Sequence, residues 1–206
     1  MKNKFLMSIL AVSFLTLSLV TGCGSKESTN GTGSSEKVNF IDNNKSYFII
    51  IDGKKFYAGD KISALEKVGY SLRASEKDEE LPANKYMIGA GHMLNSDNKN
   101  IFDVTPFNTK GSSIKVSEAV IGGIDLSYVT AKNDSKASDF EVYGGIKLGT
   151  SEAKVKEVFG EPSMVTDSIA KVYRYESEET YRSYKFTFNE NGEVSNIQWQ
   201  NLVFNK

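Results

Sequence analysis

The chain has 206 residues, of which 39% are apolar and 11% aromatic, enough to build the core of one domain or of two small ones. Its 25 basic and 26 acidic residues leave a net charge of −1. Nucleic acid is therefore not expected as a partner, because the chain has no excess of cations to neutralise phosphates.

The N-terminal residues carry the pattern of an export signal. Lys2 and Lys4 precede an apolar run over residues 5–20. This run is shorter than the about 20 residues that a membrane-spanning helix needs, and it suits the apolar region of a signal peptide. It ends in Val20-Thr21-Gly22-Cys23, which resembles the lipobox of bacterial lipoproteins. We therefore predict that residues 1–22 are a signal peptide. An ordinary secretory signal or an uncleaved anchor is the alternative.

Cys23 is the predicted site of lipidation and the only cysteine of the chain. A lone cysteine forms neither an intrachain disulfide nor a multi-cysteine metal site. Two acyl chains hold a protein stably on a bilayer, so we expect the membrane as a partner and the outer face of the cell membrane as the location. Residues 24–37 are small, polar or charged, and residues 23–37 are therefore predicted to be the lipidated cysteine and a flexible tether.

The next part of the chain is rich in short β-type segments. Residues 47–51 and 54–57 flank Asp52-Gly53, a pair typical of a hairpin turn. The charged residues 75–85 are expected to form a solvated loop. Further strands are expected at residues 86–88, 101–105 and 114–121.

Two short helices are expected, each framed by glycine. The first follows Asp60 as its N-cap and the second follows Thr150 or Ser151. Gly69 and Gly160 are expected to end them. The similar frames suggest an internal duplication as a hypothesis. The apolar positions on the buried sides are Ile62, Leu65 and Val68 in the first helix and Val155, Val158 and Phe159 in the second.

The C-terminal residues are expected to form antiparallel strands. Residues 184–188 alternate between aromatic and polar side chains, and residues 189–192 form a turn. Val194 is out of phase with Ile197 and Trp199, which indicates a bulge or the end of a strand. The three expected strands are residues 171–176, 184–188 and 194–200.

These patterns predict an α+β fold of two small modules, each a short helix packed on an antiparallel sheet. The N-terminal α+β module spans residues 38–130. The C-terminal helix-plus-antiparallel-sheet module spans residues 140–206. The polar residues 131–139 are the candidate boundary between them.

The C-terminal motif consists of Gly149-Thr150, the Gly160-x-Pro162 helix stop and the closing hairpin. It resembles the C-terminal repeat of uncharacterised lipoproteins from Gram-positive bacteria. It is similar, more distantly, to the BamE-type lipoproteins of outer-membrane assembly and to the β-lactamase inhibitor protein fold. This resemblance implies a helix-on-sheet module that binds other proteins, with no catalytic residue. The assembly role is not carried over, because a composition rich in Lys, Asn and Ser is more typical of organisms without an outer membrane.

No recognisable catalytic or metal-binding motif occurs in the sequence. His92 is the only histidine and is interpreted as an exposed turn residue, with a loop ligand or a base as the alternative. Ser151 and Lys154 match the Ser-x-x-Lys motif of penicillin-recognising enzymes, but the accompanying Lys-Thr-Gly strand is missing, so Ser151 is interpreted as a helix cap. Residues 97–103 lack the glycine and glutamate of a calcium loop. We predict no catalytic residue, no metal and no cofactor.

Three aromatic residues, Tyr173, Tyr175 and Trp199, form the predicted binding patch. On one exposed face they would suit protein or glycan binding, whereas packing in the core is the alternative. We therefore predict a lipoprotein that is not an enzyme and that binds an envelope protein or the cell wall. An envelope hydrolase and a surface inhibitor of a hydrolase or β-lactamase are the alternative functions.

Overall fold

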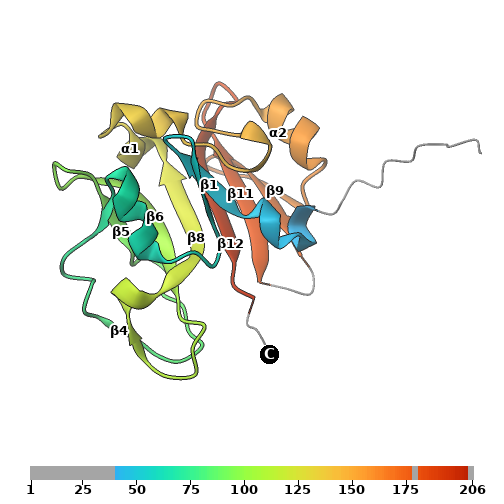
Figure 1. Ribbon diagram of the computed structural model, residues 1–206. Coiled ribbons are helices and arrows are strands. Elements are labelled where there is room, and N and C mark those ends of the chain that lie inside the picture. The colour runs from blue at the N-terminus through green and yellow to red at the C-terminus, as the bar shows by residue number, and fades with distance from the viewer. Residues whose placement is uncertain (1–39, 178–180, 204–206) are drawn as a thin grey trace, which may run out of the picture. The chain divides into compact units, whose positions relative to one another are not determined.

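An eight-stranded antiparallel sheet forms the centre of the fold (Figure 1). The computed structural model describes residues 40–177 and 181–203. The strands of the sheet lie in the order β3-β5-β6-β8-β12-β11-β10-β9. In chain order their bounds are Ser71–Leu72 (β3), His92–Leu94 (β5), Asn100–Phe107 (β6), Val120–Ser127 (β8), Met164–Asp167 (β9), Lys171–Glu176 (β10), Arg182–Phe188 (β11) and Val194–Asn201 (β12).

Two small strand pairs and several short helices complete the described residues. The pairs are β1 (Phe48–Ile51) with β2 (Lys54–Tyr57), and β4 (Glu80–Leu81) with β7 (Ile114–Lys115). The α-helices are α1 (Tyr128–Ala131) and α2 (Glu152–Phe159). The 3-10 helices are η1 (Phe40–Asp42), η2 (Asn44–Ser46), η3 (Ile62–Val68), η4 (Val116–Glu118), η5 (Ser135–Asp139) and η6 (Tyr143–Gly145).

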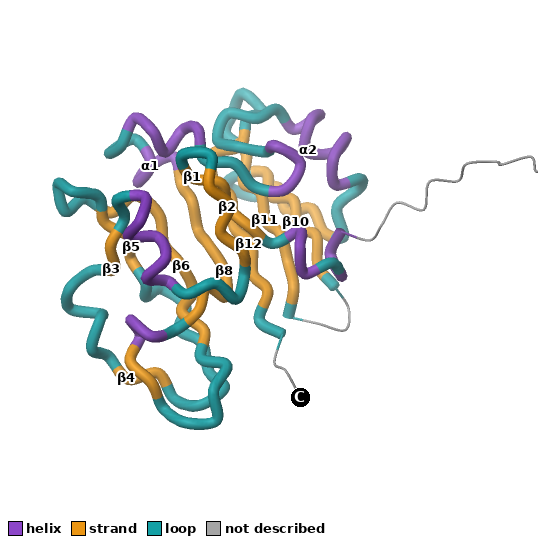
Figure 2. Tube along the Cα trace, in the orientation of Figure 1, coloured by secondary structure: helices purple, strands orange, loops and turns teal. Residues whose placement is uncertain are grey.

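The core lies on one face of the large sheet, which the β1–β2 hairpin and the short helices cover (Figures 1 and 2). Tyr47, just before β1, stacks on Tyr184 of β11 with 5.3 Å between ring centroids. Phe159 of α2 meets Phe186 of β11 edge to face at 4.9 Å. All four rings are at most 6% exposed. Burial of aromatic surface on this face is therefore a main stabilising contribution to the fold.

Local sequence signals explain several of these elements. Asp52 and Gly53 both have positive φ, 49° and 74°, as the tight turn of the β1–β2 hairpin requires, so the predicted hairpin is confirmed. The Ser151 side chain accepts a hydrogen bond of 3.3 Å from the Lys154 amide at the start of α2. Gly160, with φ of 80°, ends this helix. The second predicted helix is thus confirmed, with Val155 and Phe159 buried.

The predicted fold class is wrong. The chain is mostly β, and one continuous sheet replaces the two helix-on-sheet modules because β8 pairs with β12 along residues 123–127 and 196–200. Residues 131–139, expected to be polar and flexible, form the end of α1 and the helix η5. Ala131 and Ala137 within them are 4% and 0% exposed and belong to the core.

Some local predictions also need correction. Asp60 does not cap the first helix; its carboxylate accepts from the Tyr57 amide at 2.8 Å, and η3 begins after Lys61. Residues 86–88 form only an isolated bridge from Tyr86 to Phe107. The irregularity predicted at Val194 is confirmed. Val194 pairs with Phe188, and the β11–β12 register shifts between Thr187 and Phe188. The strand predicted over residues 114–121 is wrong, since these residues form β7, the helix η4 and only the first two residues of β8. Strands β3, β4, β5 and β9 were not predicted.

Two adjacent glycines permit the close approach of β8 to its neighbours, Gly123 to β12 and Gly122 to β6 and Leu202. A β-carbon on Gly123 would lie 2.5 Å from the Trp199 carbonyl oxygen of β12. A β-carbon on Gly122 would lie 2.6 Å from the Leu202 side chain and 2.8 Å from Phe107 Cβ. Neither glycine has positive φ, so it is the close approach of neighbouring atoms, not the backbone conformation, that requires glycine here.

We therefore expect Gly123→Ala to lower the free energy of unfolding by about 1–3 kcal/mol, as overpacking against a fixed backbone does. Urea unfolding of the purified chain measures this. Gly111→Ala is the matched control, because a β-carbon there meets nothing within 4 Å. Equal unfolding midpoints for the two variants would contradict the steric explanation.

Candidate functional site

The structure places the predicted site residues away from any exposed patch. Cys23 lies outside the described residues. Tyr173, Tyr175 and Trp199 are 3%, 3% and 0% exposed. Their alternation does put them on one face of the sheet, but this face is covered by α2 and the β1–β2 hairpin (Figure 1). The expected aromatic patch is therefore wrong, because these rings pack into the core instead of facing solvent.

The opposite face of the sheet carries a row of polar residues. Along it, cross-strand partners follow one another from β5 to β10, and all are half-buried. Acidic residues occupy one end and basic residues the other. The row consists of His92, Asp103, Asp125, Gln198, Lys185 and Arg174. A solvated polar face is usual for an antiparallel sheet with one covered side, so this row by itself does not identify a function.

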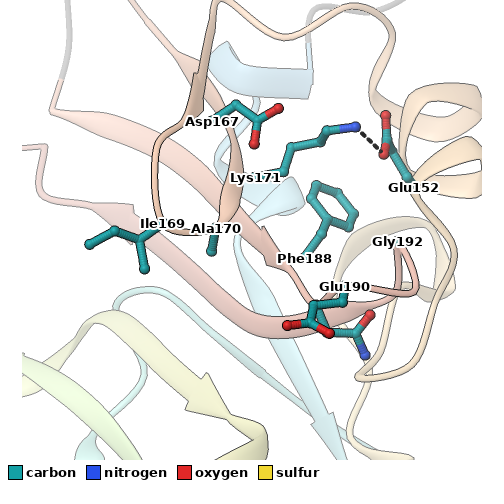
Figure 3. Close-up of a pocket in the computed structure, with 9 residues that line it drawn as sticks. Glu152, Asp167, Ile169, Ala170, Lys171, Phe188, Glu190 and Gly192 are labelled. Carbon is teal, nitrogen blue, oxygen red and sulfur yellow. Dashed lines mark hydrogen bonds and ion pairs between the residues drawn. The ribbon is translucent and has the colours of Figure 1, made fainter.

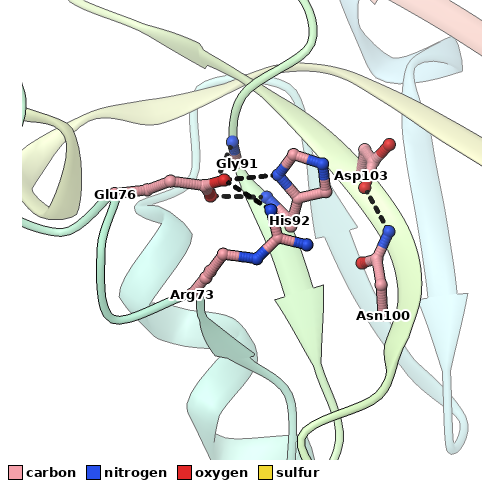
Figure 4. Close-up of polar contacts among 6 residues, drawn as sticks. All are labelled: Arg73, Glu76, Gly91, His92, Asn100 and Asp103. Carbon is pink, nitrogen blue, oxygen red and sulfur yellow. Dashed lines mark hydrogen bonds and ion pairs between the residues drawn. The ribbon is translucent and has the colours of Figure 1, made fainter.

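A buried glutamate organises the acidic end of this row (Figure 4). Glu76 is 7% exposed and accepts hydrogen bonds from the amides of Gly91, at 3.1 Å, and His92, at 2.9 Å. Its other oxygen contacts His92 Nδ1 and the Arg73 guanidinium, the latter at 3.3 Å. Glu76 thus satisfies backbone groups at the start of β5. Its expected place in a solvated loop is wrong, because these donors compensate for its burial.

His92 lies between two carboxylates, those of Glu76 and Asp103 (Figure 4). A carboxylate bound to Nδ1 orients the ring, as in catalytic triads. In the part of the chain that the structure describes, however, no serine, threonine or cysteine side chain hydrogen-bonds to this ring. No group of three or more His, Cys, Asp or Glu side chains among the described residues is arranged to hold a metal ion. The contacts of the pair are with the amides of Gly91 and His92 and with the Arg73 guanidinium.

Asp103 has an unusual electrostatic environment. Burial raises the pKa of its carboxyl group, and the nearby charges of Asp125 and Glu76 raise it further. The Asn100 amide, which donates to Asp103 at 2.9 Å, and His92 act in the opposite direction. Asp125 itself accepts from Asn196 at 2.6 Å and so holds its charge close to Asp103.

Strand β9 forms one edge of the sheet and is exposed along its whole length. Met164 is 50% and Val165 54% exposed, and Ile169 in the following turn is fully exposed. Val165 is opposite Tyr173 and points to the covered side, whereas Met164 is opposite Arg174 and points to the open side. Because β9 pairs only with β10 among the described strands, every second residue presents its N–H and C=O outward. This combination makes β9 a ready template for another strand.

The opposite edge of the sheet lacks these properties. Strand β3 has only two residues, Ser71 and Leu72, and Leu72 is 5% exposed. A very short edge strand with its apolar side chain buried offers little surface for pairing. The difference between the edges makes β9 the strongest candidate for a functional surface.

No protein-family model, no curated protein and no solved structure matches this chain. The resemblance of its C-terminal motif to lipoproteins therefore stays a prediction. Within residues 40–177 and 181–203, no helix has the length and apolar character needed to cross a membrane.

Sequence reasoning missed both features that define these sites. The signal for β9 was Met164-Val165 shortly after Pro162, a β-type pair that was too short to stand out. Glu76 had no signal, because an acidic run predicts solvent exposure. Only the contacts with Gly91 and His92, which lie 15 and 16 residues further on, reveal its burial.

The pKa of Asp103 is expected to lie above that of an ordinary aspartate and to fall in Asp125→Asn, which removes a neighbouring negative charge. Titration followed by NMR of the carboxyl carbon measures both. Since the folded state binds more protons between the unfolded and folded pKa values, the free energy of unfolding falls as pH rises through this window, and Asp103→Asn removes the fall. The exposed Asp97→Asn is the control and leaves the pKa of Asp103 unchanged. A pKa of Asp103 at or below the ordinary value would contradict this account.

Proposed function

We propose that this chain is a lipoprotein, anchored by a lipid on Cys23 to the outer face of the cell membrane, that binds another protein and catalyses no reaction. The single observation that carries the proposal is the exposed apolar edge strand β9. The lipobox pattern of residues 20–23 supports the location.

An edge strand of this kind suits recognition of an extended protein segment. Main-chain hydrogen bonds supply affinity when a peptide adds to a sheet, and side chains of the edge supply specificity. Natural proteins usually protect exposed edges with charges, proline or a covering loop. Met164 and Val165 make the first half of β9 apolar and exposed, although Asp167 places a charge at its end. Adjacent exposed apolar side chains next to unpaired main-chain groups favour an interaction site.

A binding role fits the described polar groups better than a hydrolytic one. The Glu76–His92 pair makes its contacts to the backbone of β5 and to Arg73, which is a structural use of the pair. Hydrolysis would need a nucleophile and donors for an oxyanion converging on one point. The inhibitor alternative is a special case of protein binding, in which the bound protein is an enzyme.

Replacement of Cys23 with serine is expected to release the chain from the membrane, because the thiol that accepts the lipid is lost. Labelling of cells with a fatty-acid analogue, followed by fractionation, measures both the modification and the location. Ser25→Ala is the control and stays labelled and membrane-bound. A Cys23→Ser chain that still carries the label would contradict the anchor.

A photo-reactive residue in place of Met164 is expected to yield an adduct of discrete mass in intact cells. Val165→Lys is expected to abolish this adduct, since a charge on the edge opposes strand pairing. Val129→Lys is the matched control, because Val129 is 69% exposed on α1, away from this edge. An adduct that persists in Val165→Lys, or the absence of any discrete adduct, would argue against binding at β9.

A further inference from the structure

A hollow of about 360 Å³ adjoins the end of strand β9 (Figure 3). It lies on the covered side of the sheet, between the β9–β10 turn, the start of α2 and the β11–β12 turn. The residues that define its chemistry are Glu152, Asp167, Ile169, Lys171, Phe188 and Glu190. Asp167 lines this hollow and also belongs to the exposed edge strand β9. A peptide that pairs with β9 can therefore place a side chain in the hollow.

The hollow is negatively charged. Three carboxylates and one ammonium group line it, which gives a formal charge of −2 (three negative charges and one positive). Lys171 Nζ lies 2.9 Å from Glu152 Oε2, and the Tyr173 hydroxyl donates to the other oxygen of Glu152. These two bonds lower the pKa of the Glu152 carboxyl group, so it is ionised and pairs with Lys171. The carboxylates of Asp167 and Glu190 form no hydrogen bond or ion pair with a described side chain, although the charge of Asp167 acts on the nearby Lys171 ammonium and helps to raise its pKa.

The hollow is also partly apolar. The Phe188 ring lies at its centre in Figure 3 but is only 2% exposed, so its accessible apolar surface comes from Ala170 and from the fully exposed Ile169. An apolar surface next to two unpaired carboxylates fits a long aliphatic side chain with a cation at its end. Lysine and arginine have this form, because their stems cover apolar surface while their charged ends stay at a polar site.

We infer that β9 accepts an extended segment of a partner protein as a ninth strand of the sheet, and that a lysine or arginine of this segment enters the hollow. The inference rests on the proposed protein-binding function and names its partner class. Side chains alternate along a strand, so partner residues opposite Val165 and Asp167 lie two positions apart on the covered side. The recognised segment therefore has a basic residue two positions from an apolar one.

Three other occupants of the edge are less suitable. A second copy would pair β9 with β9 and bring no cation to either hollow, leaving Asp167 and Glu190 unpaired in both. A lipid surface in bacteria carries anionic headgroups, which the charge of the hollow repels. The chain's own residues 24–37 contain no apolar residue to place opposite Val165, and they include three Gly, a residue that is depleted in strands.

The test uses the full-length lipoprotein in detergent and a fluorescent, end-capped peptide, Thr-Val-Thr-Lys-Thr-Val-Thr. In this sequence a valine stands two positions before and two positions after the lysine. The lysine can therefore lie opposite Asp167 and a valine opposite Val165 whether the peptide pairs in the parallel or the antiparallel direction. Anisotropy titrations compare it with peptides in which norleucine, glutamate or proline replaces the lysine. We expect the lysine peptide to bind at least about tenfold more tightly than the norleucine peptide. The glutamate peptide binds more weakly still, owing to repulsion by the carboxylates of the hollow, and the proline peptide binds no better than the norleucine peptide, because proline lacks the cation and is disfavoured within a sheet.

Variants of the protein then test whether the carboxylates of the hollow cause the preference for the lysine peptide. The double variant Asp167→Asn with Glu190→Gln is expected to bind the lysine and norleucine peptides equally. Asp97→Asn with Glu118→Gln, which removes two exposed carboxylates elsewhere, keeps the preference. All four residues are exposed, so none of these changes disturbs the core.

Several results would overturn the inference. The first is that the lysine peptide does not bind. The second is that the lysine and glutamate peptides bind equally well. The third is that the preference for lysine survives in the double variant Asp167→Asn with Glu190→Gln. A concentration-dependent dimer that Val165→Lys abolishes would assign the edge to a second copy instead. The crosslinking experiment tests the proposed function separately. If the adduct formed at position 164 disappears in Val165→Lys cells, protein binding at β9 is supported even when the peptides show no preference for lysine. Failure of the basic-segment inference and failure of the proposed function are therefore distinguishable.

Discussion

The pairing of β8 with β12 is the constraint on which the rest of the structure depends. It joins four strands from residues 71–127 to four strands from residues 164–201 in a single sheet. Gly123 makes it possible, because a side chain there would collide with the backbone of Trp199. With one sheet the chain has one large core, and both halves contribute to it. The polar row and the two sheet edges are consequences of the same pairing.

Aromatic residues are concentrated on the covered face of the sheet, where they form the core. Phe159 of α2 packs against Tyr175, Tyr184 and Phe186, with ring centroids 4.9–5.2 Å apart. The hydroxyl of Tyr184 donates to the Ser46 carbonyl at 2.6 Å, and the hydroxyl of Tyr175 donates to the Gly160 carbonyl at 3.2 Å. Such bonds let tyrosine be buried without an unsatisfied polar group. Aromatic residues are therefore structural on this sheet, and under the proposed function recognition would fall to its edge.

The edge at β9 differs from the opposite edge of the sheet because exposed apolar side chains and main-chain N–H and C=O groups without a partner among the described strands occur on the same strand. Met164 and Val165 share their strand with Asp167, which lines a negatively charged hollow. Under the proposed function, this hollow would add a selective element to an otherwise general mode of strand addition. Charges at the rim of an interface govern which partners are rejected more than how tightly the right one binds. A tether on the membrane would hold such an edge within reach of envelope proteins.

The sequence by itself determined the local elements. Asp52-Gly53 set the β1–β2 hairpin, Ser151 and Gly160 set the limits of α2, and the phase of Val194 indicated the irregular β11–β12 pairing, because each depends on residues a few positions apart. The lipobox pattern and the tether are predictions of the same local kind. Tertiary structure decided that two expected sheets are one, that Glu76 is buried, that the aromatic face is covered and that β9 ends the sheet. These outcomes depend on contacts between residues far apart in the chain, which local periodicity does not encode.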